Sequence, residues 1–69
     1  MPKDYAKAFA WFRKEAEQGN AFAQYNFGLM YENGGGLQRD LSSARFWYEK
    51  AAAKGYEEAR KRLNALKGK

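Results

Sequence analysis

Apolar residues recur three and four positions apart through most of the chain, which is the spacing of an amphipathic helix. Four segments carry this spacing, and none shows the alternation of apolar and polar residues expected of a half-buried strand. The pattern therefore predicts an all-α fold. The predicted helices span residues 4–18, 20–33, 40–54 and 57–66.

Polar residues and glycines mark the borders of these segments. The predicted N-caps are Asp4, Asn20 and Asp40. Their side chains can accept hydrogen bonds from the free amides of a first helical turn. Gly19 and Gly55 are predicted to end helices in the left-handed conformation. The glycines at 34–36 are predicted to join two antiparallel helices, because a phosphate-binding loop would follow a strand and end in Lys-Ser or Lys-Thr.

The chain contains an internal repeat. A shift of 36 residues aligns it with itself at seven identical positions without a gap. The aligned pairs are Asp4/Asp40, Ala8/Ala44, Trp11/Trp47, Lys14/Lys50, Ala16/Ala52, Gly19/Gly55 and Ala23/Ala59. A fixed period of this length indicates stacked supersecondary units, and here each unit is a pair of helices.

Small residues recur on the second and third predicted helices, where two helices could approach closely. They are Ala23, Gly28, Ala44, Ala51 and Ala52. Gly28 is predicted to be such a contact, with large side chains such as Trp47 and Tyr31 filling the space beside it. A leucine at Gly28 is therefore expected to overpack the helix crossing.

The residues from 23 to 55 resemble the Sel1-like repeat, a relative of the tetratricopeptide repeat. The resemblance is carried by Ala23, Phe27, Gly28, Met30, Tyr31, Gly34, Gly36, Leu37, Asp40, Ala44, Trp47, Tyr48, Lys50, Ala51, Ala52 and Gly55. It implies one domain over residues 1–69, an α/α solenoid of antiparallel hairpins with about four helices. Its expected parts are the second helix of a half unit at 4–18, a full repeat at about 20–55 and a terminal first helix at 57–67.

The last predicted helix departs from the repeat pattern. Asn64 and Lys67 replace the glycine and tyrosine of the repeat, which suits a terminal helix with a polar outer face. The family usually carries several repeats, so a chain of four helices is interpreted as a fragment, a minimal member or an engineered unit. The absence of cysteine places it outside the disulfide-containing branch of the family.

The resemblance implies an adaptor that presents a concave surface to a protein or peptide partner. The second predicted helix has an additional apolar stripe of Phe22, Tyr25 and Leu29, which either packs on neighbouring helices or lines this groove. Arg62 is the repeat equivalent of Asn26, so both are expected to project into one groove, where Arg62 could bind a carboxylate. The predicted peptide-binding residues are Tyr25, Asn26, Leu29, Arg62 and Phe22.

Self-assembly is the alternative function. Fewer than three repeats rarely bury a continuous core, so a second copy could dock on an apolar face of an end helix and form a homodimer. Exposed aromatic residues would mark that face, and the candidates are Phe9, Phe46 and Tyr56.

The residue types argue against an enzyme. The chain has no cysteine and no histidine, which removes thiol nucleophiles, imidazole bases and the usual zinc ligands. Ser42 and Ser43 therefore have no histidine to activate them. No catalytic residue, metal site, cofactor or small-molecule substrate is predicted.

The net charge of +5 arises entirely after Glu58, because the first 58 residues are neutral. A basic last helix could attract nucleic acid, but Arg60–Arg62 lacks an interleaved stacking platform, so a solvated helix face is the simpler interpretation. No apolar run approaches the roughly 20 residues of a membrane span, and the first residues do not resemble a signal peptide. A cytoplasmic location is the default expectation.

Overall fold

The computed structural model describes residues 5–34 and 38–67 of the chain. These residues form four helices and no strand. The helices are α1 (Tyr5–Glu17), α2 (Ala21–Asn33), α3 (Leu41–Ala53) and α4 (Glu57–Lys67). The predicted all-α class is confirmed, and each helix begins and ends within one residue of its predicted bounds.

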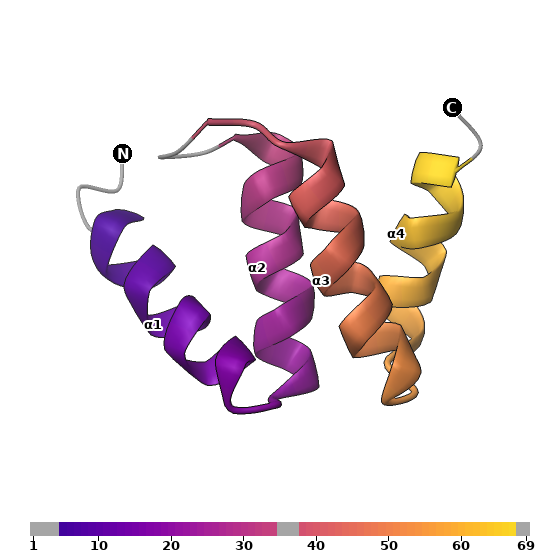
Figure 1. Cartoon of the computed structure of the whole chain (residues 1–69), viewed down its shortest axis with the longest axis horizontal. Coiled ribbons are helices and arrows are strands. Elements are labelled where there is room, and N and C mark those ends of the chain that lie inside the picture. Colours follow the sequence, from indigo (N-terminus) through magenta and orange to yellow (C-terminus); the bar gives the residue numbers. More distant parts are fainter. Residues whose placement is uncertain (1–4, 35–37, 68–69) are drawn as a thin grey trace.

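The helices lie in series, so that α2 packs between α1 and α3, and α4 packs on α3 (Figure 1). Successive helices run in opposite directions and are joined by short connections at alternating ends of the array (Figure 1). This is the predicted solenoid of helical hairpins. Within the described residues, no helix is long and apolar enough to cross a bilayer.

Two of the predicted N-caps form as expected. The Asn20 side chain accepts a hydrogen bond from the amide of Ala23 at 3.1 Å, and Asp40 accepts one from the amide of Ser43 at 3.2 Å. Each cap satisfies one of the amides that a first turn leaves without a helical partner. The third predicted cap, Asp4, lies outside the described residues.

Glycine ends α2 in the left-handed conformation. Gly34 has φ of 70°, and its amide donates to the carbonyl oxygen of Met30. Gly19 and Gly55, after α1 and α3, also have positive φ values, so both predicted helix stops are confirmed, and Gly34 has the positive φ expected of a turn glycine. The other two predicted turn glycines, Gly35 and Gly36, lie outside those residues.

The core consists of two neighbouring clusters. The first lies between α1 and α2, and its buried residues are Ala16, Ala23, Phe27 and Met30. The second lies between α3 and α4, and its buried residues are Ala44, Tyr48, Ala51, Ala59 and Leu63. Tyr31 packs against both clusters and joins them into one apolar interior.

The helices α2 and α3 approach each other closely at Gly28. A Cβ atom on Gly28 would lie 2.7 Å from Cε1 of Tyr48 and 3.2 Å from the carbonyl oxygen of Ala44. The first distance is shorter than real side chains tolerate, so only glycine fits without movement of the buried tyrosine. The predicted close contact at Gly28 is thus present.

Candidate peptide-binding surface

The five residues predicted to bind a peptide fall on two helices, four on α2 and Arg62 on α4. Tyr25 and Leu29 are partly buried against the α3–α4 cluster, so they contribute to the core. Phe22, the third member of their stripe, is 53% exposed. The stripe is therefore divided, with its middle and end in the interior and its first residue at the surface.

A row of aromatic rings connects this surface to the core. The ring of Phe22 lies 6.4 Å from that of Tyr56, which lies 5.2 Å from Tyr25. Tyr25 in turn lies 5.9 Å from the fully buried Tyr48. Contact with a ligand at Phe22 would thus occur on side chains that are already fixed by their neighbours.

Asn26 bonds to its own helix. Its side-chain amide donates to the carbonyl oxygen of Phe22 at 2.9 Å. This bond occupies one of its two amide hydrogens and holds the side chain along α2. A ligand would therefore meet the second amide hydrogen or the oxygen of Asn26.

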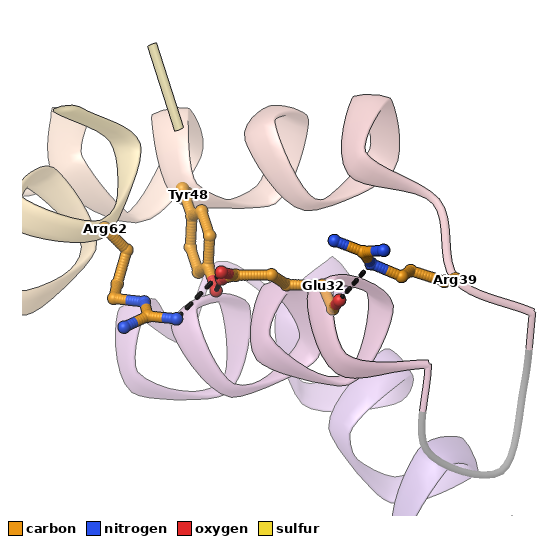
Figure 2. A network of polar contacts seen from close by, with 4 residues as sticks. All are labelled: Glu32, Arg39, Tyr48 and Arg62. Carbon is orange, nitrogen blue, oxygen red and sulfur yellow. Dashed lines mark hydrogen bonds and ion pairs between the residues drawn. The ribbon is translucent and has the colours of Figure 1, made fainter. Parts of the chain in front are cut away.

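Arg62 takes part in a polar network that joins three helices (Figure 2). Its Nη2 donates to Oε2 of Glu32 on α2 at 2.8 Å, and the hydroxyl of Tyr48 on α3 donates to the other carboxylate oxygen at 2.6 Å. Arg39 donates to the backbone carbonyl of the same glutamate at 3.0 Å (Figure 2). Glu32 is thus the common partner of α3 and α4.

The network changes the proton affinity of its members. Partial burial alone raises the pKa of Glu32, but hydrogen bonds from Tyr48 and Arg62, together with nearby positive charge, outweigh burial and lower it. Burial and the bond to Glu32 raise the pKa of the Tyr48 hydroxyl, which therefore remains a donor. The bond to Glu32 likewise raises the pKa of Arg62, which remains a cation.

The lowered pKa of Glu32 predicts an acid-sensitive contribution to stability. A carboxyl whose folded pKa lies below its unfolded value of about 4.3 stabilises the fold above that pH, and the contribution is lost as the pH falls through the folded pKa. Acidification below pH 5 is expected to lower the free energy of unfolding. We expect this decrease to be smaller in Glu32→Gln than in the parent chain. Urea unfolding measured across this range tests the difference.

Asp40 provides the control for this titration. Hydrogen bonds from Ser43 also lower the pKa of its exposed carboxyl, so it contributes acid sensitivity of its own. Part of the decline must therefore remain in Glu32→Gln and disappear only when Asp40→Asn is added. Identical pH profiles for the parent and Glu32→Gln would contradict the role of the network.

The guanidinium of Arg62 remains partly accessible. Its side chain is 41% exposed, whereas that of Glu32 is 17% exposed, although the Nε atom of Arg62 is buried. Arg60 on the same helix is paired with Glu57 at 2.8 Å. Two of the basic residues of α4 are thus already in ion pairs, which reduces the positive charge available to nucleic acid.

This surface is open rather than enclosed. Residues 5–34 and 38–67 enclose no pocket, so a ligand would lie along the helices instead of entering a cavity. The same residues hold no group of three or more carboxylates, cysteines or histidines that could bind a metal ion. The arrangement suits an extended partner better than a small molecule.

The roles of two residues at this surface, Glu32 and Tyr56, could not be predicted from the sequence. No local signal in the sequence connects Glu32 with Arg62, because the two are 30 residues apart. Tyr56 was noted only as a candidate docking aromatic, yet it is partly buried against Tyr25 and the α3–α4 cluster. Of the other candidate docking residues, Phe9 packs on Phe27 while Phe46 is 51% exposed.

Comparison with known proteins identifies the repeat. The sequence model of the Sel1 repeat matches residues 1–20 and again residues 21–56. No solved structure matches the chain significantly.

Three curated relatives align with nearly the whole chain. The chitin synthase regulator SKT5 of Malassezia restricta is 43% identical over 68 residues, which are 99% of this chain and 5% of that protein. Chitin synthase regulatory factor 3 of Schizosaccharomyces pombe is 46% identical over 63 residues, 91% of this chain and 7% of that protein. The DAP3-binding cell death enhancer 1 of Rattus norvegicus is 48% identical over 63 residues, 91% of this chain and 12% of that protein. The chain therefore spans a small part of each relative.

Proposed function

The chain belongs to the Sel1 repeat family, and on that premise we propose that it is a non-catalytic interaction module that binds a peptide segment of a partner protein. The proposed binding surface is formed by Phe22, Tyr25, Asn26 and Leu29 of α2 with Arg62 of α4. The names of the relatives support a role of this kind, since two are called regulators of chitin synthase and one is called DAP3-binding.

The observation that carries the proposal is the fixed, partly exposed cation of Arg62. Glu32 holds one edge of the guanidinium at 2.8 Å, so its orientation is set before a ligand arrives. A guanidinium binds carboxylates through parallel hydrogen bonds, and the preferred ligand is therefore a peptide with a free C-terminal carboxylate.

Phe22 supplies the apolar part of the proposed contact. Its exposed ring lies on the aromatic row that leads to Tyr25, so an apolar ligand side chain packed on Phe22 would meet a rigid surface. Aromatic residues, phenylalanine included, are enriched in protein interfaces, and a few well-packed residues carry most of the binding energy.

A peptide array with paired free and amidated C-termini tests the proposal. We expect the chain to retain free-carboxylate peptides in preference to their amidated partners, and Phe22→Ala to weaken the best of them by roughly tenfold. Phe46→Ala is the matched control, because Phe46 is 51% exposed but lies on α3. Equal weakening by the two substitutions would remove Phe22 from the binding surface.

Two variants distinguish carboxylate binding by Arg62 from the contribution of Arg62 to folding. Arg62→Gln is expected to abolish the preference for a free carboxylate, but it also leaves Glu32 without its cation. Glu32→Gln disturbs the same pair while retaining Arg62, so it is expected to keep the preference. Loss of the preference in both variants, together with a lowered melting temperature in each, would assign the effect to the fold instead of to carboxylate binding. A thermal melt of each variant accompanies the binding measurement.

A further inference from the structure

Glu32 places a negative charge beside the cation on which the proposed peptide binding depends. Its side chain is 17% exposed, and its Oε2 atom lies 2.8 Å from Nη2 of Arg62. A charge that is largely removed from solvent is screened less than a charge at the surface. A ligand at Arg62 would therefore meet the field of both groups, the guanidinium and the carboxylate.

The position of the Glu32 carboxylate is fixed from another side. The hydroxyl of Tyr48 donates to Oε1 of Glu32 at 2.6 Å (Figure 2). Movement of the carboxylate away from Arg62 would also break this bond to Tyr48, whose ring is fully buried. The lowered pKa of Glu32 keeps the carboxylate ionised at neutral pH. The negative charge is thus a permanent part of the surface.

Only part of the Arg62 guanidinium remains for a ligand. A guanidinium holds its N–H donors in a fixed planar fork. The Nε atom of Arg62 is buried and has no hydrogen-bond partner within the described residues, and one hydrogen of Nη2 is donated to Glu32. The remaining donors are those of Nη1 and the second hydrogen of Nη2, which suit one carboxylate. A ligand carboxylate bound there would lie close to that of Glu32, because both would share Nη2.

We propose that Glu32 is a specificity-determining residue of this surface, which restricts the ligand to a peptide end with one negative charge and disfavours an end with two. This inference rests on the proposed function. The first ligand carboxylate bonds to the free donors of Arg62. A second one finds the cation already neutralised and is repelled by Glu32, and repulsion between like charges is a common means of excluding wrong partners.

Three versions of one peptide test the inference by fluorescence anisotropy with the full chain. The peptide is the one that the parent chain binds best in the array, and its last residue is changed to asparagine with an amidated end, asparagine with a free carboxylate, or aspartate with a free carboxylate. These ends differ in steps of one negative charge. We expect the parent chain to bind the free asparagine peptide most tightly and the aspartate peptide roughly tenfold more weakly.

The variant Glu32→Gln is expected to reverse this order. Glutamine retains an oxygen that accepts a hydrogen bond but carries no charge, so the aspartate peptide should bind at least as tightly as the free asparagine peptide. Asp40→Asn is the matched control, because it also removes one negative charge, from an exposed carboxyl that caps α3 and is not bonded to Arg62. Asparagine remains a good N-cap, and we expect the order of the parent chain.

Three results would overturn the inference. The first is tighter binding of the aspartate peptide by the parent chain, which requires no variant to fold. The second is the same order of affinities in the parent chain and in Glu32→Gln. The third is an equal change in Asp40→Asn, which would assign the effect to net charge. The proposed function fails separately, if neither the parent chain nor Glu32→Gln distinguishes the free asparagine peptide from the amidated one.

Discussion

Replacing Gly28 with leucine is expected to lower the free energy of unfolding by about 1–3 kcal/mol. Even the first side-chain atom at this position would lie 2.7 Å from the ring of Tyr48, which is fully buried. The helices α2 and α3 must therefore separate or the ring must leave its position. For a domain of this size, about 1 kcal/mol corresponds to a decrease in Tm of roughly 4–8 °C.

Gly28→Ala distinguishes a steric effect from a change in helix propensity. Alanine is the better helix former by about 1 kcal/mol, so in the absence of a clash the substitution would stabilise α2. We expect it to be neutral or destabilising instead. Ala10→Leu, on the exposed side of α1, controls for the addition of a leucine to a helix surface and should leave the Tm nearly unchanged. An increase in Tm for Gly28→Ala would contradict the close contact.

Tyr48→Ala is expected to cost about 3–5 kcal/mol, the range typical of large aromatic residues removed from a core. Tyr48 is 0% exposed, it contacts α2 at Gly28, and its hydroxyl bonds to Glu32. A chain of 69 residues has a total stability of about 3–10 kcal/mol, so this substitution removes at least about a third of it and, in the lower half of that range, most or all of it. Circular dichroism at 25 °C should then show loss of helix.

Two variants divide the contribution of Tyr48 into its parts. Tyr48→Phe keeps the ring and removes only the bond to the carboxylate, so it should cost about 1.5–3 kcal/mol and leave the chain folded. Phe12→Ala removes the repeat-equivalent ring, which is only partly buried, and should cost less than Tyr48→Ala. Similar costs at positions 12 and 48 would mean that the cover provided by α2 adds little stability.

The sequence predicted those features of the fold that depend on neighbouring residues. Caps such as Asn20 and stops such as Gly34 act within one helical turn, and the spacing of apolar residues is a property of a single helix. The repeat then indicated how successive helices are arranged. The contact at Gly28 could also be predicted, because glycine disfavours a helix interior and fits best there where a second helix approaches closely. Its partner Tyr48 could not be predicted in the same way.

Features that depend on contacts between helices far apart in the chain were harder to predict from the sequence. The stripe of Phe22, Tyr25 and Leu29 was recognised, but its division between surface and core depends on where α3 and α4 lie. Arg62 was predicted from its alignment with Asn26, yet its partner Glu32 has no equivalent among the described residues of α4. The role of these residues in peptide binding remains a prediction.

The repeat also shows why identical residues can differ in environment. Trp11 and Trp47 occupy the same position of the unit, but within residues 5–34 and 38–67 Trp47 packs on Phe27 of α2 while Trp11 is 52% exposed. A sequence alignment records the position within the repeat, whereas burial is decided by which helices pack against that position.

The serial packing of the four helices has a consequence for how quickly the chain folds. Because each helix contacts the next one along the chain, most contacts join residues that are close in sequence, and little loop-closure entropy opposes their formation. Such low contact order is associated with folding in roughly microseconds to milliseconds. The ion pair between Glu32 and Arg62, which closes a span of 30 residues, is then expected to form late, after the helical hairpins on either side have assembled.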